Sequence, residues 1–223
     1  PTPATPMLRS LVGSEMCIRD RASSKWVFKN FFRCRVYNPE RVPGSGSVII
    51  AANHESYFDP PFIGSSLFRP LNYLARENIF SHWLSGPFFR RLNSVPVDRD
   101  GGGAKGLKII LDRLLNNSGI IIFPEGTRTF DGEMLSSQAG IGLAIIKSQA
   151  PVVPVRVWTF NAYNRNQLFP KPLMISVKFG KPLDFEHLRS KAKKCPRVEL
   201  RGIYQEAAEM TMCAIEKLRP IKD

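Results

Sequence analysis

Short apolar runs recur along the chain between polar segments, and six of them, most of them short and β-branched, are predicted to be strands. The predicted strands are residues 47–52, 72–76, 94–97, 119–123, 152–158 and 173–179.

Between these runs the apolar positions change to a helical period. The clearest helix is predicted over residues 104–116, where Leu107, Ile110, Leu111 and Leu114 share one face. Further helices are predicted from residue 60 to about 68, over 138–149, and from about 198 to 218. Strands that alternate with helices predict an α/β fold with a mostly parallel sheet flanked by helices.

The length of 223 residues suits one domain. Residues 1–22 lack periodicity, and the stretch 14–20 reads like translated adapter sequence. We therefore expect residues 1–22 to be a non-native or disordered leader and residues 23–223 to form a single domain. The chain begins with Pro1 rather than Met, so we expect upstream sequence to be missing, and an anchor could be missing with it. No apolar run approaches the roughly 18 residues that a transmembrane helix needs.

The charge is strongly basic and unevenly spread. The 32 Lys and Arg residues exceed the 19 Asp and Glu residues, which gives a net charge of +13. Residues 51–162 carry 11 basic and 9 acidic side chains, so the excess lies toward the two ends. A nucleic-acid binder would concentrate basic residues on its recognition element, so this distribution favours an anionic membrane surface or an acidic partner. The alternative is a solvated basic surface that binds nothing.

The four cysteines form no C-x-x-C pair and are too few for a secreted disulfide framework. We interpret them as reduced thiols in a cytosol-facing protein, and we expect no metal site. The chain also contains no G-x-S-x-G motif, and no cysteine lies in a recognisable nucleophile setting. If the protein is an enzyme, the attacking alcohol should therefore come from a substrate.

One candidate for chemistry directly follows the predicted strand 47–52. His54 and Asp59 are five positions apart, and Asp59 with Pro60 reads as a helix start in which Asp59 is the N-cap. On an ideal helix, positions five apart point about 140° away from each other, so only a turn could bring the two side chains together. The functional interpretation is a His base oriented by Asp. The alternative is that Asp59 only caps the helix and His54 bonds a loop carbonyl.

A second candidate follows the predicted strand 119–123. Gly126 would let an anion approach the backbone, Thr127 offers a hydroxyl, and Arg128 carries a guanidinium suited to phosphate. Loops at the carboxyl ends of strands hold ligands in α/β folds, although Pro and Gly also mark ordinary turns. The glycines of residues 101–106 fit G-x-G-x-x-G, but Asp98 to Asp100 separate them from the strand, so we reject a dinucleotide site.

Taken in order, His54 with Asp59, then Arg99, then residues 123–128 and then residues 151–155 resemble the blocks of the glycerolipid acyltransferase family. The best-known members of this family are the 1-acyl-glycerol-3-phosphate acyltransferases. The resemblance covers roughly residues 26–185 and implies a glycerol-phosphate acyltransferase-like fold.

The resemblance also implies roles for single residues. His54 would deprotonate the free hydroxyl of a lysophospholipid, 1-acyl-glycerol-3-phosphate in the first place, and Asp59 would orient the imidazole. The substrate-binding residues would be Arg99, Glu125, Gly126, Thr127 and Arg128. The acyl donor would be a thioester, either acyl-coenzyme A or acyl carrier protein, with no cofactor. The product would be phosphatidic acid, made at the cytoplasmic face of a membrane.

The sequence departs from the family pattern at two places. Asn93 stands where the second block usually has glycine, and asparagine is the next most tolerant residue of left-handed backbone. Residues 137–140 lack the Lys or Arg that many members place before the glycine at position 140, so the resemblance does not extend to an auxiliary anion contact, and the head group need not be a bare phosphate. A non-catalytic lipid- or phosphate-binding protein on the same scaffold remains the alternative function.

Aromatic residues and arginines over residues 79–91 suit a water–bilayer interface, and core packing of the aromatics is the other interpretation. No role is expected for His82 or His187.

Overall fold

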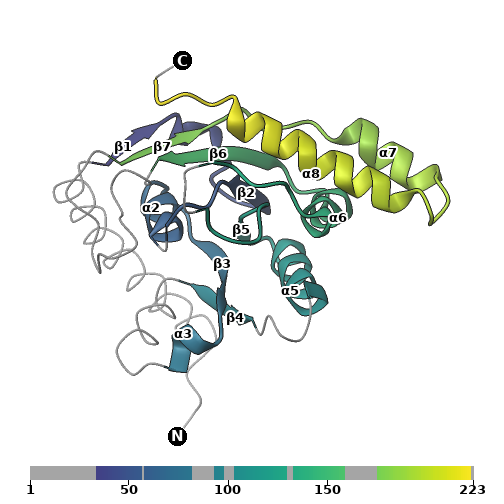
Figure 1. Ribbon diagram of the computed structural model, residues 1–223, viewed down its shortest axis with the longest axis horizontal. Helices are drawn as coiled ribbons and strands as arrows, with labels where there is room; N and C mark the ends of the chain where they lie inside the picture. The colour runs from purple at the N-terminus through teal and green to yellow at the C-terminus, as the bar shows by residue number, and fades with distance from the viewer. Residues whose placement is uncertain are drawn as a thin grey trace, which may run out of the picture.

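The computed structural model describes residues 34–56, 58–81, 93–97, 103–129, 133–158 and 175–221. These residues form a seven-stranded sheet with helices on both faces (Figure 1). The strands are β1 (Arg35–Tyr37), β2 (Val48–Ala52), β3 (Leu71–Arg76), β4 (Ser94–Val97), β5 (Gly119–Ile122), β6 (Val152–Trp158) and β7 (Ser176–Phe179).

The strand order is β1-β7-β6-β2-β5-β3-β4. Of the neighbouring pairs, β6 with β7 is antiparallel and the other pairs are parallel. The predicted α/β fold with a mostly parallel sheet is therefore confirmed. β2 lies inside the sheet between β5 and β6, which explains why its five residues are all buried.

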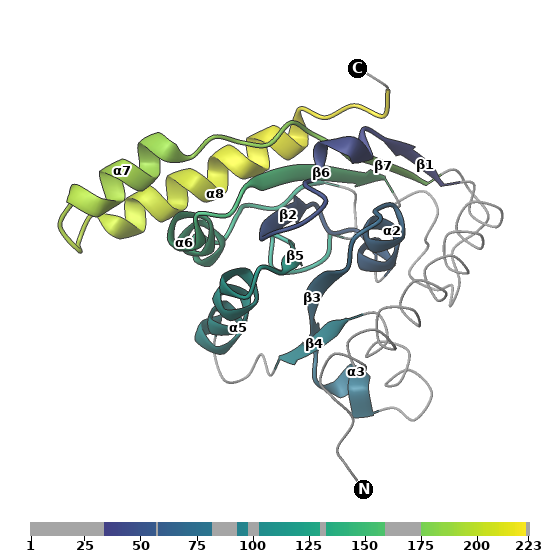
Figure 2. The same cartoon turned by 180° about the vertical axis from the view of Figure 1, so that it is seen from behind.

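The helices divide between the two faces of the sheet (Figure 2). One face is covered by α2 (Asp59–Ser65), and the other by α5 (Gly103–Leu115), α6 (Ala139–Ser148) and α8 (Leu200–Glu216). α7 (Glu186–Lys194) packs beside α6 and α8. The short elements are α3 (Asn78–Ser81) and the 3-10 turn η1 (Pro39–Arg41).

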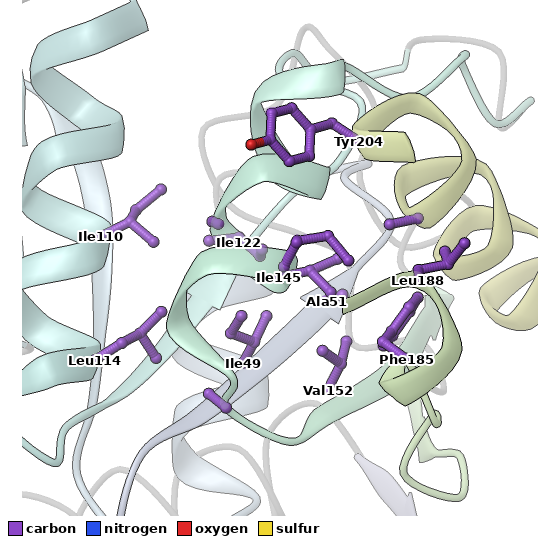
Figure 3. Close-up of a cluster of buried hydrophobic side chains, with 14 of the residues drawn as sticks. Ile49, Ala51, Ile110, Leu114, Ile122, Ile145, Val152, Phe185, Leu188 and Tyr204 are labelled. Carbon is purple, nitrogen blue, oxygen red and sulfur yellow. The ribbon is translucent and has the colours of Figure 1, made fainter. Parts of the chain in front are cut away.

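Each face of β2 enters a separate hydrophobic core. Val48, Ile50 and Ala52 pack toward α2, where Phe62 and Ile63 are buried. Ile49 and Ala51 point to the opposite face, into the cluster drawn in Figure 3. That cluster joins the sheet to α5, α6, α7 and α8 through Ile110, Leu114, Ile145, Leu188 and Tyr204. Because both faces of β2 are covered, all five of its residues are buried and apolar.

The predicted elements differ from the structure mainly at their ends. The helix predicted to reach residue 68 ends at Ser65, and the strand predicted over 119–123 ends at Ile122. β1, α7, α3 and η1 were not predicted. Asp59 is the first residue of α2 and not its N-cap, which is Phe58, so the predicted cap was wrong by one position. Within the described residues, no helix is long and apolar enough to cross a bilayer.

The chain segments that follow β2 and β5 run over opposite faces of the sheet. β2 continues through α2 on one face to β3, whereas β5 continues through α6 on the other face to β6. In α/β folds, ligands bind near the carboxyl ends of adjacent strands whose connections run over opposite faces of the sheet. The two candidate motifs occupy the loops at the carboxyl ends of β2 and β5.

Candidate active site

The loop after β2 and the loop after β5 are bonded to each other at His54. The backbone N–H of Thr129 donates to the carbonyl oxygen of His54, with N···O 2.9 Å. The backbone N–H of His54 donates to Oε1 of Glu125, also at 2.9 Å. The fold therefore brings the two separately predicted motifs into direct contact.

The imidazole of His54 meets the carboxylate of Asp59 as the spacing allowed. Nδ1 of His54 lies 2.9 Å from Oδ2 of Asp59. An ionised carboxylate can only accept hydrogen bonds, so with Asp59 ionised the donor of this bond would be Nδ1, and Nε2 of a neutral ring would keep its lone pair. The loop before α2 thus places His54 and Asp59 in contact although they are five positions apart, and it leaves Nε2 of His54 outside this bond.

Asp59 organises the loop in addition to the imidazole. Its Oδ2 atom accepts the backbone N–H groups of Glu55, at 2.7 Å, and of Ser56, at 2.8 Å. The residue is fully buried, and a buried charge is tolerated when it is hydrogen-bonded and paired. The carboxylate oxygen therefore points back into the loop that carries His54.

A phenylalanine that the sequence reasoning did not single out holds the face of the imidazole. The ring of Phe123 stacks on the ring of His54 with centroids 4.0 Å apart and an interplanar angle of 20°. The His54 side chain keeps 16% of its surface exposed. Stacking fixes the plane of the ring and the Asp59 bond fixes its rotation, while part of the ring remains accessible to a substrate.

Asn53, which the sequence reasoning also missed, anchors the residue before His54. Its Nδ2 donates to the carbonyl oxygen of Val157 at 2.9 Å, and its Oδ1 accepts the N–H of Val157 at 2.8 Å. This side chain continues the pairing of β2 with β6 after the β2 backbone has turned away. A polar residue at the end of a fully apolar strand was the available sequence signal.

Glu125 bonds to backbone groups on two sides. Oε1 accepts the N–H of His54, and Oε2 accepts the N–H of Leu135 at 3.0 Å. The residue is only 3% exposed. Burial raises the pKa of the Glu125 carboxyl, and the two N–H bonds partly oppose that rise because they favour the charged form.

The turn after Glu125 explains why residue 126 is a glycine. Gly126 has φ +70°, a left-handed conformation that glycine adopts without strain, and its N–H donates to the carbonyl oxygen of Phe123. A Cβ at this position would also overlap the side-chain amide of Gln138. Thr127 is exposed and Arg128 is half-buried. Both therefore reach the surface beside the bonded pair of loops.

Two further predicted positions have different outcomes. Asn93 has φ 60°, which confirms the expected left-handed conformation at the position where glycine is usual. Arg99 lies outside the described residues, as do residues 82–92 of the aromatic and arginine stretch. The leader predicted over residues 1–22 also lies outside the described residues.

The described cysteines, Cys34, Cys195 and Cys213, lie outside the loops after β2 and β5. No group of three His, Cys, Asp or Glu side chains within the described residues could hold a metal ion. Burial raises the pKa of the Cys34 thiol to about 11, which keeps it protonated at neutral pH.

Comparison with known proteins relates this arrangement to a family. Residues 33–158 match the model of the family described as Acyltransferase. A 1-acyl-sn-glycerol-3-phosphate acyltransferase of Bacillus subtilis is 29% identical over 169 residues, which cover 74% of this chain and 82% of that protein. The human 1-acyl-sn-glycerol-3-phosphate acyltransferase beta is also 29% identical, over 64% of this chain and 53% of that protein.

A solved structure has the same fold. The crystal structure of PlsC, the 1-acyl-sn-glycerophosphate acyltransferase of Thermotoga maritima, matches with a TM-score of 0.65 at 24% identity. The match covers 98% of this chain and 85% of that one. The predicted glycerol-phosphate acyltransferase-like architecture is therefore confirmed.

Proposed function

The chain belongs to the acyltransferase family, and on this premise we propose that it moves a fatty acyl chain from an acyl thioester to the free hydroxyl of a lysophospholipid. The preferred acceptor is 1-acyl-glycerol-3-phosphate, on which the relatives are named to act, and the product is phosphatidic acid. The motifs predicted this family and an O-acyltransferase, and the family match bears out both expectations.

The observation that carries the proposal is the contact between His54 and Asp59. With Nδ1 bonded to the Asp59 carboxylate, Nε2 is free to take the proton of the acceptor hydroxyl. The hydroxyl oxygen then attacks the thioester carbonyl carbon, the carbon–sulfur bond breaks, and the proton passes to the departing thiolate. Asp59 stabilises the imidazolium that forms between these steps.

The second loop supplies the anion site in this proposal. Arg128 and Thr127 reach the surface one and two residues before Thr129, whose N–H is bonded to the His54 carbonyl. A phosphate bound there would lie close to the base, as a lysophosphatidate requires, because its phosphate and its free hydroxyl are only a few bonds apart. Gly126, Glu125 and Arg99 complete the set that the family resemblance assigns to this site.

The donor and the location are further parts of the proposal. Acyl-coenzyme A and acyl carrier protein are both anionic, so the excess of 13 positive charges favours association with either donor. The same charge attracts the chain to an anionic membrane surface, where lysophospholipids reside. We place the enzyme at the cytoplasmic face because both candidate donors are intracellular.

A substrate panel tests the proposal. The protein in detergent is incubated with labelled acyl-coenzyme A or acyl carrier protein and, in separate reactions, with lysophospholipids that carry phosphate, choline, ethanolamine or glycerol head groups. We expect a diacyl product, formed fastest from lysophosphatidate. Binding of lysophosphatidate without formation of product would instead favour a non-catalytic lipid-binding protein.

A further inference from the structure

The main chain of His54 depends on a different segment for both of its hydrogen bonds. β2 ends at Ala52, so the sheet ladder provides no partner for the N–H and C=O groups of His54. Buried or half-buried backbone groups need partners, and here the segment after β5 provides them. Glu125 accepts from the N–H, and the N–H of Thr129 donates to the C=O.

The carboxylate of Glu125 joins the loop of His54 to a later part of its own segment. While Oε1 of Glu125 bonds to His54, Oε2 accepts the N–H of Leu135, ten residues further along the chain. Gln138 closes the same segment, because its backbone N–H donates to the carbonyl oxygen of Pro124. The carboxylate is 3% exposed and lies beneath the turn whose surface carries Thr127 and Arg128.

We propose that Glu125 is a positioning residue, which fixes the main chain of His54 so that the imidazole stays between Phe123 and Asp59. This inference rests on the proposed function, in which His54 is the base. It gives Glu125 a different task from the substrate contact that the family resemblance assigns. A carboxylate directed at a phosphate would repel it, and both oxygens of Glu125 already accept N–H groups.

The substitution Glu125→Gln separates the two tasks. Glutamine has the same shape, but its amide has one accepting oxygen and one donating nitrogen. Both partners of Glu125 are N–H donors, so one of the two bonds is replaced by a contact between donors. Glu133→Gln is the matched control, because Glu133 lies exposed on the same segment and its replacement removes the same charge.

Steady-state kinetics with acceptor and donor varied separately give the first readout. A base displaced by about 1 Å loses on the order of a hundredfold in rate. We therefore expect Glu125→Gln to lower kcat about 10- to 100-fold, with acceptor KM unchanged and with Glu133→Gln like the wild type. A rise in acceptor KM at unchanged kcat would mean that Glu125 contacts the head group, and it would overturn the inference. Unchanged kcat and KM would overturn it as well.

Proton NMR gives a readout that does not depend on turnover. The proton between Nδ1 of His54 and Asp59 should give a downfield resonance, which is assigned by its loss in Asp59→Asn. We expect this resonance to broaden or shift in Glu125→Gln and to stay unchanged in Glu133→Gln. An unperturbed resonance in folded Glu125→Gln would contradict the positioning role.

The two claims fail in different ways. A wild-type protein that transfers no acyl chain counts against the proposed function, while the resonance still decides the role of Glu125. If Glu125→Gln does not fold, Glu125→Asp takes its place, since it keeps the charge and is one methylene too short to hold both N–H groups. For that variant, too, we expect a lowered kcat at unchanged acceptor KM, and the opposite pattern overturns the inference.

Discussion

Replacement of Asn53 by alanine should destabilise the protein by an amount that follows from its two bonds to Val157. Asn53 is 1% exposed and Val157 is fully buried, so truncation leaves the N–H and the C=O of Val157 without their partner and shielded from water. An unsatisfied buried polar group costs roughly 1 to 3 kcal/mol. The two groups together therefore predict a loss of about 2 to 6 kcal/mol, at the lower end if water enters the vacated space.

Urea unfolding followed by circular dichroism measures this loss, with the slope of the transition checked for a two-state change. Asn116→Ala is the control, because the Asn116 side chain is exposed and, within the described part of the chain, bonds to Asp112 one helical turn earlier. That variant should stay within about 0.5 kcal/mol of the wild type. A loss below about 1 kcal/mol for Asn53→Ala would refute the reasoning that this side chain carries the pairing of β2 with β6 beyond the backbone ladder.

The remaining predictions concern the anion site, the core and the thiols. Arg128→Lys keeps the charge but loses the planar guanidinium fork, so kcat/KM for the acceptor should fall on the order of ten- to a hundredfold while donor KM stays constant. Kinetics with acceptor and donor varied separately measure this, and a change confined to donor KM would place Arg128 at the thioester end. Gly142→Ala should destabilise the fold by about 1 to 3 kcal/mol in thermal or urea unfolding, since the added methyl overlaps the Tyr204 backbone of α8. Gly140→Ala, where nothing lies nearby, should instead stabilise α6 by up to about 1 kcal/mol, and equal effects of the two changes would count against this packing. In timed alkylation at pH 8, the exposed Cys213 should react ahead of Cys34, because burial raises the pKa of the Cys34 thiol to about 11. The Cys34→Ser variant should keep the turnover of the wild type, and loss of activity in a folded Cys34→Ser protein would point to a covalent acyl-enzyme.

The interior strands could be predicted because they are buried on both faces. β2, β5 and β6 consist almost entirely of apolar residues, and the predicted ranges agree with the structure within a residue or two. β1 was missed because it has three residues, of which Arg35 and Val36 are exposed at the edge of the sheet. α7 was missed because Leu188 is its only buried residue, so it shows almost no apolar period.

The site was predictable in its parts but not in its connections. The spacing of His54 and Asp59 allowed a contact, and the motif after β5 indicated a loop at the carboxyl end of a strand. Two of these connections depend on the adjacency of β2 and β5 in the sheet. They are the bond of Glu125 to the His54 backbone and the stacking of Phe123 on the imidazole. Such long-range pairing leaves no local pattern in either segment.

The central claim is that His54 acts as the base, and acyl transfer by His54→Gln tests it most directly. The variant is compared with the wild type at saturating lysophosphatidate and acyl-coenzyme A, after both proteins are shown to unfold at the same urea concentration. Loss of general-base catalysis predicts a fall in kcat of about 10²- to 10⁴-fold. A folded His54→Gln protein that turns over at the wild-type rate would contradict the account.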